Sequence, residues 1–164
     1  MPESIYNIKD ILEINSNAVD DLKRRAFEST RKRFRLCMHH SNEDQTQEML
    51  IVFHKDTFMP PHRHPKGKSE SYHIIEGSMT VFFLNDDGDL IHEIEMEKAG
   101  GSKPFLYRLS TNAWHMPFIT SEWLVYHETY SGPFTKEYDV EFPLWAPEEE
   151  DKPSIKHFMK RLIG

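Results

Sequence analysis

Short apolar runs that alternate with polar residues fill most of the chain after Arg33. Alternate side chains of an extended strand point to opposite faces, so each run predicts a β-strand. Turn formers separate many of the runs, and the stretch "LNDDGDL" at residues 84–90 predicts a hairpin because Asp and Gly tolerate left-handed turn conformations. Seven or more short strands of this spacing predict an antiparallel sandwich or a jelly-roll barrel. The runs are FRLCM, MLIVF, SYHII, MTVFFL, LIHEIEM, FLYRL and WLVYHETY.

Both ends of the chain show helical spacing instead. Residues 6–27 carry apolar side chains three and four positions apart, with a break at "NSN". Near the C-terminus the apolar positions are again spaced for one face of a helix, which ends in Lys160, Arg161 and Gly164. We therefore expect a helical extension over residues 1–30, a barrel over 31–147 and an amphipathic helix over 148–164 that packs on the barrel or on a partner subunit. The periodic positions are Ile8, Ile11, Leu12, Val19, Leu22 and Ala26 in the first segment, and Ile155, Phe158, Met159 and Leu162 in the second.

Composition narrows the class of protein. The chain has 164 residues, 38% of them hydrophobic, which is enough for one domain with a core. A net charge of −7 argues against a nucleic-acid-binding surface. The single cysteine, Cys37, excludes an intrachain disulfide and favours a reducing compartment. With no signal-like start and no long apolar run, the sequence predicts a cytoplasmic protein that does not enter a membrane.

The stretch "PPHRHPKGKSESYHIIEG" at residues 60–77 holds the candidate chemistry. His62 and His64 lie two positions apart, so on an extended strand both imidazoles point to one face. Glu70 opens the next predicted strand, and His115 follows a turn-like "STN" at the start of a further apolar run. An isolated H-x-H is common on surface strands, but its combination with a nearby Glu and a later strand His indicates a metal site.

Three imidazoles and one carboxylate suit one divalent transition metal per chain and leave about two positions of an octahedral ion open. Open positions are typical of a catalytic or ligand-binding metal rather than a closed structural one. The same ligands suit iron, manganese, nickel, cobalt and zinc, so the residue types alone do not select the element.

These residues carry a family resemblance. The run from His62 to Gly77 resembles the first cupin motif, and "STNAWH" resembles the second. Together with "RLCMHHSNEDQTQEML", "YSGPF" and "WAP", they resemble the WbuC family of cupin-fold metalloproteins, which are associated with bacterial O-antigen and surface-polysaccharide gene clusters. The resemblance implies a mainly β cupin barrel (a double-stranded β-helix or jelly roll), a metal held by His62, His64, Glu70 and His115, and a role in sugar or nucleotide-sugar metabolism.

The strand "RFRLCMH" offers a candidate anion-binding face. Two sets of side chains alternate along it: Arg33, Arg35, Cys37 and His39 on one face, and Phe34, Leu36 and Met38 on the other. The alternation alone does not show which set faces the barrel interior. If the first set does, the two arginines would bind a phosphate or carboxylate of the substrate. The alternative is a solvated edge strand.

Other candidates are weaker. Gln47 is a candidate hydrogen-bonding residue for the substrate, unless it lies at an exposed strand end. Tyr72 shares the face of Glu70 and, with His39, is a candidate for proton transfer. On the last strand either Tyr126 and Glu128 face inward, or their alternating neighbours Trp123, Val125 and His127 do.

Several functions fit this pattern. Metal-assisted isomerisation or epimerisation of an anionic sugar or nucleotide-sugar comes first, and an iron-dependent oxygenase uses the same ligands. A cupin that binds a small ligand without turnover, or a metal-free barrel that acts as an interaction protein, are the non-enzymatic alternatives. We expect a homodimer, because the C-terminal helix has an apolar face and because the resemblance implies a family in which dimers are usual.

Overall fold

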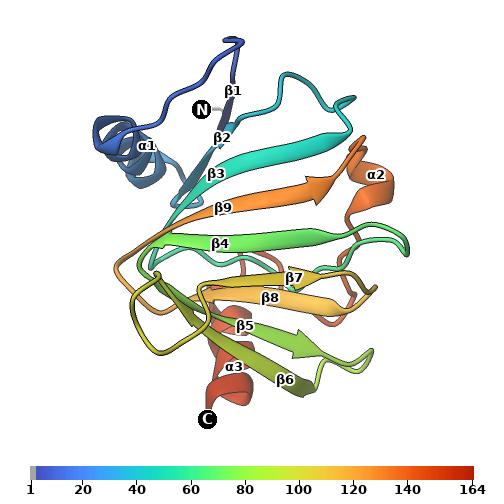
Figure 1. Ribbon diagram of the computed structural model, residues 1–164. Helices are drawn as coiled ribbons and strands as arrows, with labels where there is room; N and C mark the ends of the chain where they lie inside the picture. The colour runs from blue at the N-terminus through green and yellow to red at the C-terminus, as the bar shows by residue number, and fades with distance from the viewer. Residues whose placement is uncertain (1–2) are drawn as a thin grey trace.

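Two β-sheets face each other in the computed structural model, which describes residues 3–164 (Figure 1). The larger sheet has the order β1-β2-β3-β9-β4-β7, and the smaller has the order β6-β5-β8. All neighbours are antiparallel except β1 and β2. The strands are β1 (Ser4–Tyr6), β2 (Arg33–Cys37), β3 (Thr46–His54), β4 (Glu70–Glu76), β5 (Ser78–Leu84), β6 (Leu90–Glu97), β7 (Leu106–Leu109), β8 (Trp114–Ile119) and β9 (Trp123–Ser131).

The main core lies between the sheets, and each sheet also carries a helix on its outer face. Helix α1 (Ser16–Glu28) packs Leu22 and Ala26 against the larger sheet. Helix α3 (Lys152–Ile163) packs Phe158 and Leu162 against the smaller one. Both faces of β3 and β5 are therefore covered, which explains why their sequences read as nearly continuous apolar runs rather than as strict alternation.

The N-terminal expectation was only half right. Helix α1 begins after Asn15, whose side chain accepts a hydrogen bond from Ala18 N, at the predicted break. The earlier part of the predicted helix is not helical, and Ile8 and Ile11 are exposed. The reason is a competing set of bonds: the backbone of Asn7 donates to Cys37 O and its side chain to Met38 O, which holds this segment along β2.

The C-terminal helix packs on the barrel within the same chain, one of the two predicted arrangements. Its apolar face is thus already covered, so it provides no argument for the expected dimer. The hairpin between β5 and β6 is confirmed, and Asn85 Oδ1 accepts hydrogen bonds from the backbone of Asp87 and Asp89 inside the turn. None of the helices in the described residues is long and apolar enough to cross a bilayer.

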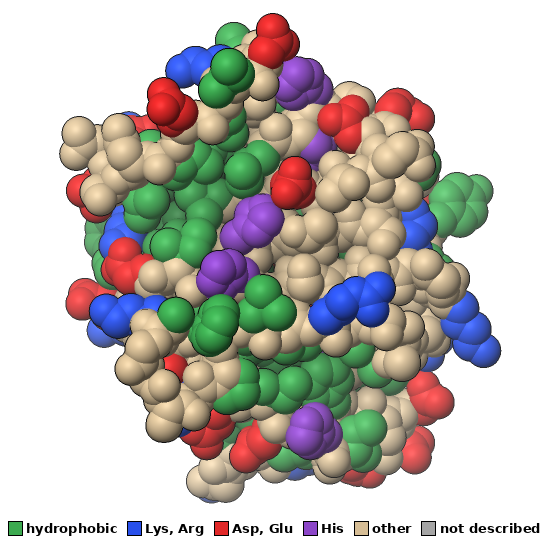
Figure 2. Space-filling view, in the orientation of Figure 1, with side chains coloured by type: hydrophobic (Ala, Val, Ile, Leu, Met, Phe, Trp, Pro, Cys, Tyr) green, Lys and Arg blue, Asp and Glu red, His purple; other side chains and the backbone are tan. Residues whose placement is uncertain are grey.

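Lysines and arginines are scattered over the face drawn in Figure 2, most of them toward its edges, and do not form one broad patch. Hydrophobic side chains on this face gather in separate areas between acidic and polar ones. Basic, acidic and apolar side chains are therefore interspersed over this face.

Gly77, between β4 and β5, tests how tightly the two sheets are joined. Its φ is +81°, and a Cβ there would lie 2.0 Å from the carbonyl oxygen of Trp123. Gly100 also has a positive φ, +105°, but a Cβ there would meet nothing within 4 Å. We expect Gly100→Ala to cost about 1 kcal/mol from φ alone, and Gly77→Ala about 2–4 kcal/mol because it adds a backbone clash. Urea unfolding measures both, and equal losses would contradict this account.

Candidate metal centre

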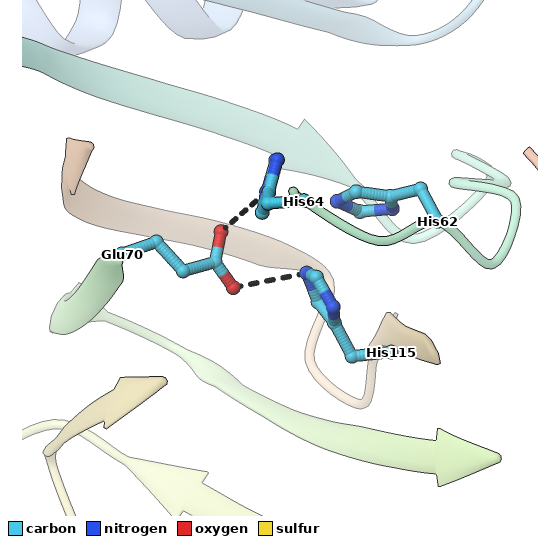
Figure 3. Close-up of side chains that lie close together, drawn as sticks. All are labelled: His62, His64, Glu70 and His115. Carbon is cyan, nitrogen blue, oxygen red and sulfur yellow. Dashed lines mark hydrogen bonds and ion pairs between the residues drawn. The ribbon is translucent and has the colours of Figure 1, made fainter. Parts of the chain in front are cut away.

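Three separate segments bring the predicted ligands together. His62 and His64 lie on the extended segment between β3 and β4, and His62 forms an antiparallel bridge with His115, the second residue of β8. The two backbones exchange hydrogen bonds of 3.0 and 2.9 Å. Glu70 is the first residue of β4 and points into the space between the sheets (Figure 3). The bridge therefore adds the H-x-H segment to the edge of the smaller sheet, facing the carboxylate from the larger one.

The four side chains form one compact cluster. One ligand atom from each lies within 4.8 Å of the others, and all four residues are buried. Glu70 lies between two of the rings, with Oε2 at 3.1 Å from His64 Nε2 and Oε1 at 2.9 Å from His115 Nε2 (Figure 3). Tyr107 donates a hydrogen bond of 3.1 Å to Glu70 Oε1 and so fixes the carboxylate from the far side.

The second nitrogen of each histidine is held by a backbone carbonyl. Nδ1 of His62 lies 3.1 Å from Pro60 O, that of His64 lies 2.6 Å from Asp139 O, and that of His115 lies 3.0 Å from Ala113 O. A carbonyl only accepts, so each ring carries a proton on Nδ1 and turns Nε2 toward the cluster. This arrangement is typical of metal-binding histidines. His64 Nε2 also hydrogen-bonds Glu70 Oε2 at 3.1 Å, so this ring has to give up its Nε2 proton when it binds a metal.

His115 Nε2 provides the test of fit. It is fully buried and has no hydrogen-bond partner among the described residues, because the contact with Glu70 does not have hydrogen-bond geometry. A buried polar nitrogen without a partner is costly. A metal ion bound to this nitrogen would satisfy it, so the residues present fit a divalent transition metal.

The charge state of the cluster also suits a cation. Burial, and then the neighbouring His115 and His64, lower the pKa of His62 to about 3, so this ring is neutral near pH 7. Burial raises the pKa of Glu70, but the facing His115 and His64 outweigh it and leave that pKa well below its usual value. Burial lowers the pKa of His64, but its hydrogen bond to Glu70 and the charge of that carboxylate outweigh burial and raise it. Neutral imidazoles with an ionised carboxylate are the forms that bind metal, so a metal ion would displace the proton on His64 Nε2.

A cavity of ≈ 430 Å³ opens beside the cluster, which is the size of a small-molecule site. His62 and His64 are among the residues that line it, whereas Glu70 and His115 are not. Its other walls include the predicted substrate residues and one of the two alternating sets on β9. These wall residues are Arg33, Arg35, Cys37, His39, Gln47, Tyr72, Tyr126 and Glu128.

The structure settles the orientation of β2. Phe34 and Leu36 pack toward α1, so the arginines face the cavity. Arg33 is buried and already paired, with Nη2 at 3.1 Å from Glu149 and Nη1 donating to Phe58 O at 3.0 Å. Arg35, in contrast, makes no ion pair with any described residue. The two arginines predicted as equivalent therefore differ: Arg33 is engaged inside the protein and Arg35 is available.

His39 and Gln47 also line the cavity, but both are engaged in local structure. His39 Nδ1 lies 3.0 Å from Glu48 O and also accepts from Glu48 N, across the β2–β3 pair. Gln47 Nε2 donates to the backbone carbonyls of Ser41, Asn42 and Asp44 and holds that loop. The amide nitrogen predicted to bind substrate is thus occupied by the protein.

Glu128 is the functional candidate that the sequence left undecided. It faces the cavity with Tyr126, and in the strand register it lies opposite Tyr72 on β4 and Met49 on β3. Burial, and then the negative charge of Glu70, raise the pKa of Glu128 to about 7. Burial likewise raises the pKa of Tyr72 well above its usual value, so this hydroxyl stays protonated. Alternation alone left two faces of β9 open, and the fold selects this one.

Comparison with known proteins identifies the family. The family model described as "Domain of unknown function (DUF6016)" matches residues 14–96, just over half of the chain. The protein belongs to this DUF6016 family. The matched residues include His62, His64 and Glu70, whereas His115 and Glu128 lie beyond them. The narrower resemblance to the WbuC family stays an expectation, and no curated protein matches the sequence.

Several solved structures are similar to the DUF6016 protein. Protein SO0799 from Shewanella oneidensis superposes with a TM-score of 0.55 at 12% identity, covering 66% of this chain and 72% of that one. An oxalate oxidase bound to the substrate analogue glycolate gives 0.46 at 16% identity, covering 60% and 46%. L-Ribose isomerase from Cellulomonas parahominis gives 0.44 at 16%, covering 62% and 59%. The predicted mainly β fold, with two facing sheets and a helix toward each end, is confirmed.

The cluster makes a direct prediction about metal content. We expect the protein, purified with divalent metal supplied, to hold close to one ion per chain by elemental analysis. His62→Ala removes a neutral imidazole and should lower the metal affinity at least about 100-fold. His92→Ala, an exposed histidine on β6, is the matched control and should keep the metal. Equal metal content in both variants would exclude this site.

Proposed function

We propose that the protein is a metal-dependent cupin enzyme that moves a proton on a small, anionic, sugar-like carbonyl compound, as in isomerisation or epimerisation. One observation carries the proposal: Glu128, with a pKa raised to about 7, lines the same cavity as His62 and His64. A general acid or base works best when its pKa lies near the working pH. Proton transfer is therefore the chemistry that this cavity supports best.

The four clustered residues, His62, His64, Glu70 and His115, would hold the metal. A bound divalent ion supplies a Lewis acid that polarises an oxygen of the ligand. The protein contributes the fixed orientation of the rings, through the backbone carbonyls that accept from Nδ1, and a wall of apolar side chains that limits water.

Glu128 would take a proton from carbon or return it, and Tyr72 would donate a hydrogen bond beside it. The two are directly opposite in the β4–β9 pairing, and the raised pKa of Tyr72 keeps it a neutral donor rather than a base. This assigns the proton transfer to Glu128 in place of His39 and Tyr72, the residues predicted from the sequence.

Arg35 would bind an anionic group of the ligand. It lines the cavity and has no carboxylate partner in the described chain, while Arg33 is neutralised by Glu149. A guanidinium binds carboxylate or phosphate with two parallel hydrogen bonds. A link to surface-polysaccharide synthesis comes only from the WbuC resemblance and forms no part of this proposal.

Exchange of carbon-bound hydrogen tests the proposed reaction without knowledge of the product. The metal-loaded protein is incubated in D₂O with a panel of sugar phosphates and sugar acids, and ¹H NMR follows deuterium entry next to the carbonyl. We expect exchange with at least one compound, lowered about 10²–10⁴-fold in Glu128→Gln. Glu122→Gln, an exposed residue just before β9, is the control and should exchange normally.

Two other results would replace the proposal. Ligand binding without any exchange favours a cupin that binds a small molecule without turnover. Oxygen uptake that depends on iron and substrate favours an oxygenase.

The raised pKa of Glu128 also predicts a stability effect. The folded protein keeps a proton on Glu128 up to pH 7, whereas the unfolded chain releases it near 4.5, so this contribution is present below pH 4.5 and lost as the pH rises through 7. Glu128→Gln removes the dependence. Between pH 4.5 and pH 8, the free energy of unfolding of the metal-free variant should rise by about 1–3 kcal/mol relative to that of the metal-free wild type. Urea unfolding at both pH values measures it. If the difference in free energy of unfolding between variant and wild type is the same at both pH values, the pKa of Glu128 lies near its ordinary value.

A further inference from the structure

Residues 132–142, which follow β9 and include the short helix α2 (Lys136–Asp139), form a strap over the cavity. Phe134, Lys136, Val140 and Phe142 of this strap line the cavity. The strap then returns toward the segment that carries His62 and His64. It is therefore placed to act on both the cavity and the metal ligands.

Three links join the strap to the ligand segment. Arg63, between the two histidines, exchanges backbone hydrogen bonds of 3.0 Å with Glu141, and its Nε lies 2.7 Å from Glu141 Oε2. Lys68 Nζ donates to Pro133 O at 2.7 Å. The third link reaches a ligand itself, because Nδ1 of His64 lies 2.6 Å from Asp139 O.

His64 differs from the other two histidines in this respect. The carbonyls that accept from His62 and His115 belong to Pro60 and Ala113, each two positions away on its own segment. The carbonyl for His64 comes from 75 positions downstream. Its ring orientation therefore depends on how the strap docks, whereas the other two orientations are set locally.

The carboxylate of Asp139 fixes that docking. Asp139 is buried, and its Oδ1 accepts from Tyr130 OH at 2.8 Å and lies 3.4 Å from Lys68 Nζ, while Oδ2 accepts from Thr135 N at 2.6 Å. The ring of Tyr130 also packs on His64, with 4.6 Å between centroids. One residue thus anchors the strap with its side chain and presents its carbonyl to a metal ligand.

We propose that Asp139 is a positioning residue of the metal centre, one that keeps the His64 proton on Nδ1 and turns Nε2 toward the metal. The inference rests on the proposed metal site. A neutral imidazole has two tautomers, and the partner of one nitrogen decides which is populated. Loosening the strap would allow the other tautomer, whose Nε2–H cannot bind a metal.

The test uses Asp139→Asn, with Glu137→Gln on the exposed side of the same helix as control. ¹⁵N NMR of histidine-labelled, metal-free protein, recorded at a pH high enough to leave the imidazole neutral, reports which nitrogen of His64 carries the proton. A Co²⁺ titration gives the metal affinity. We expect Asp139→Asn to populate the Nε2–H tautomer and to weaken Co²⁺ binding about 10–100-fold. Glu137→Gln should match wild type in both measurements.

Tyr130→Phe covers the case in which Asp139→Asn does not fold. It removes one hydrogen bond to the carboxylate and keeps the ring on His64, so we expect the same changes at a smaller size, roughly 2–10-fold in affinity. A variant that loses thermal stability but keeps the wild-type tautomer and Co²⁺ affinity would overturn the inference. Wild-type protein that binds no Co²⁺ would instead overturn the metal site, while an altered His64 tautomer would still be visible.

Discussion

The burial of one carboxylate beneath three imidazoles is the constraint on which the rest of this structure depends. An ionised Glu70 in the space between two sheets is costly unless positive or hydrogen-bonding groups surround it. His64 and His115 face its two oxygens, and Tyr107 donates to it from β7. Each of these partners comes from a different segment, so the cluster forms only when β4, β8 and the H-x-H segment have reached their places in the fold.

The outer layers make this arrangement possible. Because α1 covers the larger sheet and α3 the smaller one, hydrophobic residues on both faces of the central strands are buried. The inner faces are then free to carry polar groups at one end while the apolar core holds the other. Figure 1 shows the two sheets with α1 and α3 on their outer sides and α2 beside one end of the strands. The strap residues that line the cavity lie around α2.

The cavity derives its chemical character from contrasts between neighbouring residues of like type. Two arginines on β2 face the same space, yet one is neutralised by Glu149 and the other is not. Two carboxylates also face the interior. The pKa of Glu70 is lowered by His115 and His64, which contact its oxygens, whereas burial and the charge of Glu70 raise the pKa of Glu128 despite the more distant His64 and Arg35. Groups of one chemical type therefore differ in partners and in pKa within one site.

The sequence by itself determined the local features of this protein. Alternation predicted the strands and the β5–β6 hairpin, and helical spacing predicted α3 and most of α1, since these patterns depend on neighbours within a few residues. The spacing of His62, His64 and Glu70 identified the cluster. Side chains two positions apart on an extended strand point to the same face, so the spacing shows which residues can meet.

Only the tertiary structure decided which face of β2 and β9 lines the cavity, since alternation is the same whichever side is covered. It also separated Arg33 from Arg35 through a partner 116 positions away, and selected Glu128 over its neighbours on β9. The link from Asp139 to His64 spans 75 positions. Contacts of this kind have no periodic signal in the chain, because they arise from packing between segments rather than from the order of residues within one.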